Sequence, residues 1–183
     1  IIRNSHYNTI SSKIVQCSQT GIVLENGRYN LLKGLQVSDC LQNGLLVDNS
    51  DSNTIESCRF QKNETGCNLQ GSQCKENRFQ DCVIGIPENS TEKMGNRKHG
   101  LHVRSGASSN RIANTQISGN AEYGVLIEGT DVVSNAFLSD TGRTASNQIA
   151  RNGKDGLLLR NEASKNRIAS VEFYGNGGNG ITI

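Results

Sequence analysis

The sequence is short of the residues that usually build a globular core. Its 183 residues include no tryptophan, one proline and one methionine, and aromatic residues make up 4%. No apolar run reaches the roughly 18 residues of a membrane-spanning helix, so we expect no membrane insertion. Basic and acidic residues nearly balance at a net charge of +2, which gives no electrostatic basis for binding nucleic acid.

Asparagine is abundant instead, with 22 residues against 20 glycines, and much of it belongs to a repeat. An asparagine with an apolar residue two positions later recurs at Asn8, Asn30, Asn53, Asn77, Asn110, Asn135 and Asn166. A glycine that precedes an apolar-x-apolar triplet recurs at Gly21, Gly44, Gly66, Gly100, Gly124, Gly156 and Gly180. The two marks define seven coils, and a plain coil has about 22–25 residues.

The apolar residues of each coil alternate with polar ones, as in strands with one buried face. Each apolar run is short and ends at glycine or asparagine, so the longer runs and 3.6-residue spacing of helices are missing. Leucine-rich repeats have a similar length, but their fixed leucine frame is also missing. Short strands at this period predict a parallel β-helix, and we expect one such domain over residues 1–183.

The recurring polar positions have expected roles at the corners of the coils. A stacked asparagine can bond the equivalent amide above and below it, besides tolerating a left-handed backbone. A second such column is expected four residues before each glycine, at Cys17, Cys40, Lys62, Asn96, Asn120, Asn152 and Asn176. We expect the glycine column itself to supply positive φ at a corner.

Motifs such as Asn53-Thr54-Ile55 and Asn43-Gly44-Leu45-Leu46-Val47 resemble the right-handed parallel β-helix superfamily, the pectin-lyase-like fold, over the whole chain. The resemblance implies a right-handed coil and a relation to polysaccharides. Members include pectate lyases, polygalacturonases, alginate epimerases, phage tailspikes and NosD-like periplasmic proteins, and several are not enzymes. The Asp-Asp, Gly-His-Gly and Asp-Pro-His-Glu signatures of the enzymes are missing here. No aspartate cluster supports a calcium site, so we expect no cofactor and no metal.

The chain begins and ends in the middle of a coil, without the capping segments that solenoids need. We therefore expect it to be a segment of a longer protein. No leader is visible, but a segment carries no information about secretion.

The six cysteines are expected to be mainly small core residues. Cys58 and Cys82 share one position in neighbouring coils, and Cys67 lies in an inward column. Cys17 and Cys40 stack at a corner, where a disulfide is the alternative. Zinc is disfavoured because no Cys-x-x-Cys pair is present.

Two coils carry insertions, near residues 87–99 and 140–155, which we expect to leave the same side of the rod and to wall a groove. The exposed column four residues after each glycine places Arg104, Glu128 and Arg160 in consecutive coils beside them. We expect an acidic polysaccharide to be bound by Lys98, His99, Arg104, Arg143 and Arg160, with Glu128 and His102 as catalytic candidates. The alternative is a surface charge ladder without a ligand.

A further outward column is largely aliphatic, at Val23, Leu46, Leu126 and Leu158. Parallel strands that are apolar on both faces are usually covered. The cover could be a loop, an adjoining domain or a further copy of the chain, as in a trimeric spike.

The leading hypothesis is a structural and polysaccharide-recognising rod segment of a surface, secreted or phage-borne protein, placed outside the cell, on its surface or on a virion. The first alternative is the catalytic β-helix of a polysaccharide lyase, hydrolase or epimerase. The second is a scaffold or protein–protein interaction module.

Overall fold

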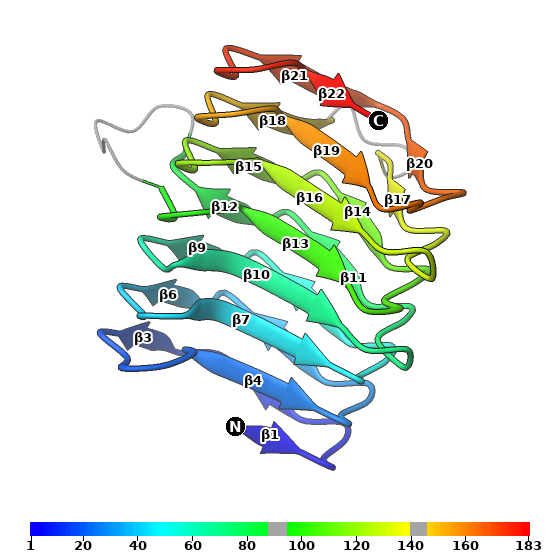
Figure 1. Ribbon diagram of the computed structural model, residues 1–183. Helices are drawn as coiled ribbons and strands as arrows, with labels where there is room; N and C mark the ends of the chain where they lie inside the picture. The colour runs from blue at the N-terminus through cyan, green and yellow to red at the C-terminus, as the bar shows by residue number, and fades with distance from the viewer. Residues whose placement is uncertain (88–94, 140–145) are drawn as a thin grey trace.

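A computed structural model of the chain describes residues 1–87, 95–139 and 146–183. These residues form three parallel sheets of eight, seven and seven strands, and the strands of each coil go to the three sheets in turn. The coils stack along one axis, with the two termini at opposite ends of the rod (Figure 1). The predicted parallel β-helix of about seven coils is confirmed. No helix among the described residues has the length and apolar character to cross a membrane.

The first sheet holds the strands that follow the glycine mark. Its order is β1 (Ile2–Arg3), β4 (Ile22–Glu25), β7 (Asn43–Asp48), β10 (Thr65–Gln70), β13 (Leu101–Arg104), β16 (Val125–Glu128), β19 (Leu157–Arg160) and β22 (Ile181–Thr182). The second sheet follows the asparagine mark, with β2 (Thr9–Ile10), β5 (Leu31–Lys33), β8 (Thr54–Glu56), β11 (Arg78–Gln80), β14 (Arg111–Ala113), β17 (Ala136–Phe137) and β20 (Arg167–Ile168). The third sheet contains β3 (Lys13–Val15), β6 (Gln36–Ser38), β9 (Arg59–Gln61), β12 (Val83–Gly85), β15 (Gln116–Ser118), β18 (Asn147–Ala150) and β21 (Val171–Tyr174).

The core consists of apolar columns that run along the rod axis. In the first sheet, Leu101 pairs with Cys67 on one side and with Val125 on the other, and all three side chains are buried. Phe79 and Ile112 continue such a column in the second sheet. Because alternate residues of each strand point inward, their neighbours form equally regular columns on the outside.

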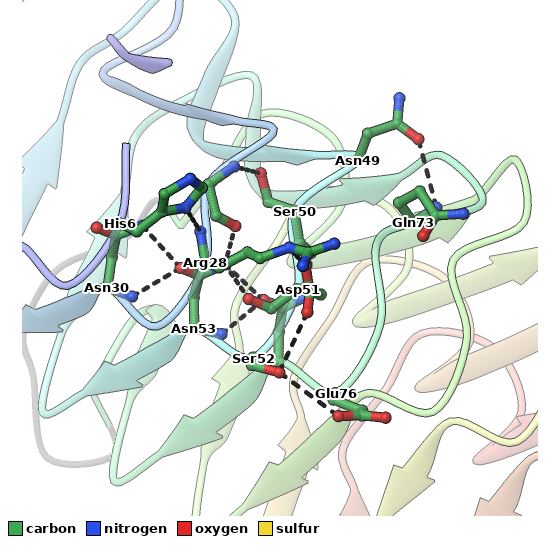
Figure 2. Close-up of polar contacts among 12 residues, drawn as sticks. His6, Arg28, Asn30, Asn49, Ser50, Asp51, Ser52, Asn53, Gln73 and Glu76 are labelled. Atoms are coloured by element: carbon green, nitrogen blue, oxygen red, sulfur yellow. Dashed lines mark hydrogen bonds and ion pairs between the residues drawn. The ribbon is translucent and has the colours of Figure 1, made fainter. Parts of the chain in front are cut away.

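The predicted asparagine ladder is confirmed. The side-chain Nδ2 of Asn53 donates to Asn77 Oδ1 at 3.0 Å. In the coil before, Asn30 Nδ2 donates to Asn53 Oδ1 at 3.0 Å, and Figure 2 shows these two residues. The same oxygens also accept a backbone N–H from the preceding coil, as Asn53 Oδ1 does from Asn30 at 2.9 Å. Each buried amide thereby satisfies the backbone of a turn that would otherwise lose its hydrogen bonds.

The second ladder exists, but one predicted member is wrong. Its amides belong to Asn63, Asn96, Asn120, Asn152 and Asn176, and successive Nδ2–Oδ1 distances are 2.8–3.3 Å. Asn63 takes the place expected for Lys62, which instead turns the corner with φ 57°. The coil of Asn63 has one residue fewer before Gly66, so counting back from the glycine gave the wrong neighbour.

The expectation that the glycine column supplies positive φ at a corner is also wrong. None of its seven members has positive φ; that conformation occurs just before each ladder asparagine, at Tyr7, Tyr29, Ser52, Glu76, Ser109, Ser134 and Lys165, with φ between 55° and 60°. Glycine is required in the column because the coils approach closely. A Cβ on Gly100 would lie 2.6 Å from the carbonyl oxygen of Gly124 in the next coil.

The two insertions leave different corners, contrary to our expectation of one side. The segment 88–94 follows β12 of the third sheet, whereas 140–145 lies between β17 of the second sheet and β18 of the third. Residues 147–150 within the predicted second insertion belong to the regular coil, since β18 pairs with β15 and β21.

All six cysteines lie among the described residues and are free, so the alternative of a Cys17–Cys40 disulfide is wrong for this structure. Five are buried, as expected for small core residues. Cys58 Sγ lies 3.3 Å from the carbonyl oxygen of Leu32, and Cys82 Sγ lies 3.4 Å from that of Ile55. Burial raises the pKa of the Cys74 thiol to about 12, which keeps it protonated at neutral pH.

Candidate functional site

The outward face of the first sheet brings most of the predicted site residues together. His102 and Arg104 lie on β13, Glu128 on β16 and Arg160 on β19, and Arg104, Glu128 and Arg160 are direct register partners. Lys98 and His99 lie in the turn that leads into β13. The remaining candidate, Arg143, falls in the segment 140–145, outside the described residues.

Glu128 is held from two sides. His102 Nε2 lies 2.8 Å from Glu128 Oε1, while the Nε and Nη2 atoms of Arg160 each lie 2.7 Å from Glu128 Oε2. Burial alone raises the pKa of Glu128, but the hydrogen bonds from Arg160 and His102 outweigh it and lower the pKa overall. Glu128 is therefore an ionised acceptor at neutral pH rather than a proton donor.

The two histidines are neutral at pH 7. Burial lowers the pKa of His102, although its hydrogen bond with Glu128 acts in the opposite direction. Burial, reinforced by nearby His102, lowers the pKa of His99 to about 4. A neutral His102 that donates from Nε2 to Glu128 keeps a lone pair on Nδ1, so that atom can accept a hydrogen bond or a proton.

An aromatic and cationic column stands beside these groups. The ring of His99 stacks on Tyr123 with centroids 5.5 Å apart and meets the ring of His102 edge-on at 5.5 Å. Lys154 Nζ lies 5.1 Å from the Tyr123 ring centroid and 3.1 Å from Glu122. The sequence reasoning missed Tyr123, although it precedes Gly124 just as His99 precedes Gly100, and this shared position was the available signal.

Arg104 belongs to a second hydrogen-bonded row. Its Nη2 donates to Gln70 Oε1 at 2.8 Å, and Gln70 Nε2 donates to Asp48 Oδ2 at 3.2 Å. Lys98, by contrast, is paired with Glu64 at 2.8 Å. Most charges of this face are therefore matched within the chain, as in the charge-ladder alternative, but the guanidinium of Arg104 contacts an amide rather than a carboxylate.

Two hollows lie on this face and meet at Arg104. One, of about 340 Å³, is lined by Asn68, Lys98, His99, His102 and Arg104, together with the coil before them. The other, of about 440 Å³, is lined by Arg104, Glu128, Asp131 and Asn161 on the far side. Of the residues that the structure describes, Arg104 is the one that lines both hollows.

Three residues that line the first hollow carry a buried polar atom without a hydrogen-bond partner. These atoms are Asn68 Oδ1, His99 Nδ1 and Arg104 Nε. Asn68 is only 4% exposed. A buried polar atom left without a partner costs roughly 1–3 kcal/mol, so these three atoms are energetically unfavourable in the chain alone.

The aliphatic outward column is better covered than expected. Leu126 is 2% exposed within this single chain, and Val23, Leu46 and Leu158 are partly buried. Leu126 pairs with His102 and Leu158 across the sheet. The column does not require a further subunit to remove Leu126 from water.

Among the described residues, no three His, Cys, Asp or Glu side chains gather in a way that could hold a metal ion. The chemistry of this face comes from neutral histidine, guanidinium, amide and ionised carboxylate groups.

Comparison with known proteins supports the architecture. A family model described as a right-handed β-helix region matches residues 1–104. The chain is similar to the Azotobacter vinelandii mannuronan C-5 epimerase AlgE4 A-module, with 14% identity and a TM-score of 0.59 over 96% of this chain and 62% of that one. It is also similar to the periplasmic alginate epimerase AlgG, with 15% identity and a TM-score of 0.64 over 96% of this chain and 45% of that one.

At these identities the likeness to solved structures shows the fold alone. The chain spans less than two thirds of either structure. No match is found among curated protein sequences.

Proposed function

Because this chain belongs to the family of right-handed β-helix regions, we propose that it recognises an acidic polysaccharide on the outward face of its first sheet. The observation that carries this proposal is the hollow around Asn68, His99 and Arg104, where three polar atoms lack partners. The set contains an acceptor, Asn68 Oδ1, and a donor, Arg104 Nε. Sugar hydroxyls both donate and accept hydrogen bonds, so they can pair with both kinds of atom once the side chains turn toward them.

The acidic character of the ligand is inferred from Arg104. Its guanidinium donates to the amide oxygen of Gln70 and forms no ion pair with a carboxylate within the described residues, and its fork can bind a sugar carboxylate in two-pronged fashion. Lys98 lines the same hollow but is ion-paired with Glu64, which lines it as well, so the inference rests on Arg104. Solved structures with this fold include proteins named as epimerases of mannuronan and alginate, which agrees with an acidic glycan as the ligand class.

A second candidate function, that of a polysaccharide lyase or epimerase, is favoured by the neutral state of His102. Glu128 fixes Nε2 and leaves Nδ1 as a proton acceptor, and His102 lines a hollow that also contains a guanidinium. Glycoside hydrolysis is less well supported, because it needs a pair of carboxyl groups and Glu128 is already ion-paired with Arg160. Glu128 then acts as a positioning residue for His102.

Either function places the protein where polysaccharides are met, outside the cytoplasm. AlgG, which shares the fold, is described as periplasmic. We extend that location to this chain as part of the same proposal.

The test incubates the protein with alginate, polygalacturonate and dextran, and measures both binding and chemical change in each glycan. We expect binding to the two acidic chains and at least about tenfold weaker binding for R104Q, since a charge-assisted contact is lost. The matched control is R167Q, which removes an exposed arginine from the second sheet. Equal affinity of R104Q and the unmodified protein would contradict the proposed site.

Chemical change in the glycan separates the two candidate functions. New unsaturated chain ends would establish a lyase, and a changed uronate composition would establish an epimerase. In either case H102Q should abolish turnover while E128Q should reduce it. Binding without chemical change supports the recognition module.

A further inference from the structure

A second polar hollow lies on a different face of the rod, over the outward side of β3, β6 and β9 of the third sheet. These three strands lie one above another at the N-terminal end (Figure 1). Their register aligns Lys13 with Gln36 and Arg59, and Val15 with Ser38 and Gln61. These residues, together with Lys62 at the following corner, line a hollow of about 290 Å³.

The charges of this hollow are unmatched, unlike those of most other faces. Elsewhere, cations stand opposite carboxylates in the next coil, as in Arg28–Asp51 and Lys33–Glu56 at 2.7 and 3.0 Å. Within the described residues, Lys13, Arg59 and Lys62 form no side-chain ion pair or hydrogen bond. Asp39 is the one carboxylate among the lining residues. Three cations therefore face a single anion, which favours an anionic ligand.

One residue that lines the hollow also has a hydrogen-bond acceptor without a donor. Gln61 Oε1 is buried and has no partner in the chain. Ser38, its register neighbour on β6, is half-buried beside it and adds a hydroxyl. A sulfate ion brings only acceptor oxygens at neutral pH, so it satisfies Arg59 but not Gln61, whereas a sugar that carries an acid group brings both an anion and O–H donors.

We propose that this third-sheet hollow is a second saccharide site that binds an acidic sugar residue. Arg59 and Lys13, two coil spacings or about 10 Å apart, hold the anionic group from either side of Gln36. Gln61 accepts a hydrogen bond from a ring hydroxyl of the same sugar. The hollow shares no residue with the first-sheet site, so it binds independently of the function proposed above.

The test measures binding of trigalacturonate, inorganic sulfate and maltotriose by calorimetry in the R104Q protein, in which the first-sheet site is weakened. We expect R104Q to retain one trigalacturonate site, and R59Q added to R104Q to weaken that site by about tenfold or more. The control R167Q added to R104Q should leave it unchanged. In labelled protein, trigalacturonate should shift the side-chain amide resonance of Gln61.

Q61L provides a second variant that removes the buried acceptor without touching a charge. It should weaken trigalacturonate binding and leave sulfate binding unchanged. The inference is overturned if R59Q has no effect in the R104Q background, or if sulfate or maltotriose binds as tightly as trigalacturonate. If R104Q alone loses all trigalacturonate binding, the second site is overturned and the first-sheet site is supported. If only R59Q loses trigalacturonate binding, the first-sheet site is overturned and the third-sheet site is supported.

Discussion

Asn77 and Asn110 are 33 residues apart in the sequence, yet Asn77 Nδ2 donates to Asn110 Oδ1 at 2.9 Å. The spacing is larger than in plain coils because the segment 88–94 is inserted between them. Asn110 Oδ1 also accepts the backbone N–H of Asn77, and Asn110 Nδ2 donates to the carbonyl oxygen of Cys74. The ladder therefore keeps the coil of Asn77 and the coil of Asn110 in register, although the chain between them contains an insertion.

Replacement of Asn110 by alanine should destabilise the protein by about 2–4 kcal/mol, because buried groups of Asn77 and Cys74 lose their partners at once. The measurement is urea unfolding followed by circular dichroism. N179A is the matched control, since Asn179 is exposed and its side chain bonds Thr182 near the chain end. An N110A midpoint equal to that of N179A would argue against a stabilising ladder.

Gly100 should not tolerate a methyl group. Its Cβ would lie 2.6 Å from the carbonyl oxygen of Gly124, so the two coils must separate, at a cost of about 1–3 kcal/mol. Gly180 occupies the same column in the last coil, where the nearest atom lies 3.3 Å from the built Cβ. We expect G100A to lower the thermal midpoint clearly more than G180A, and the close-approach explanation fails if the two variants unfold alike.

Stability should fall on acidification because His99 is buried in its neutral form. Its pKa is lowered from 6.5 to about 4, so the unfolded chain takes up a proton before the folded one does. The stabilisation is therefore complete above the unfolded pKa and is lost as the pH falls from 6.5 toward 4, by on the order of 3 kcal/mol. The lowered pKa of Glu128 acts in the same direction below its ordinary value of 4.5.

Unfolding measured by denaturant titration at several pH values between 7 and 4 tests this dependence. H99Q should be less stable at pH 7 but flatter in its pH dependence than the unmodified protein. The control H6Q changes an exposed histidine, and its profile should follow that of the unmodified protein. A profile of H99Q as steep as that of the control would place the acid sensitivity elsewhere.

The hydrogen bond between His102 and Glu128 raises the pKa of His102 against the effect of burial. E128Q removes the charged acceptor, so the pKa of His102 should fall further and the neutral form should persist to lower pH. A nuclear magnetic resonance titration of the His102 ring measures this directly. E25Q, which alters the same outward column beside Arg3, serves as the control. An unchanged His102 titration in E128Q would mean that the two side chains do not interact in solution.

Part of the candidate site followed from periodicity. Equivalent strands stack in register, so counting four residues from each glycine placed Arg104, Glu128 and Arg160 side by side, as the structure confirms. The bond from His102 to Glu128 runs diagonally, because His102 is paired with Leu126. Counting along single columns does not reveal such diagonal contacts. The stack of His99 on Tyr123 lies within one column, the position just before each glycine mark, but the residue type varies along that column and draws no attention to it.

The corners of the insertions could not be assigned from spacing. The stretch from an asparagine mark to the next glycine mark contains one strand of the second sheet, one of the third and the corners beside them. An increased spacing shows that residues are added there but not at which corner. The third-sheet hollow escaped notice because Lys13, Arg59 and Gln61 look like ordinary solvent-facing residues until their partners are known.

By itself, the sequence determined the parallel coil architecture and the direction in which most side chains point, since a repeat with apolar columns has one efficient way to bury them, whereas the right-handedness followed from the family resemblance. It also determined the first amide ladder, whose members recur at every coil. Only the tertiary structure decided which outward charges neutralise one another and which polar atoms remain unpartnered. Those properties depend on side-chain conformations and contacts between coils, whereas the periodicity records only the order of residues along each coil.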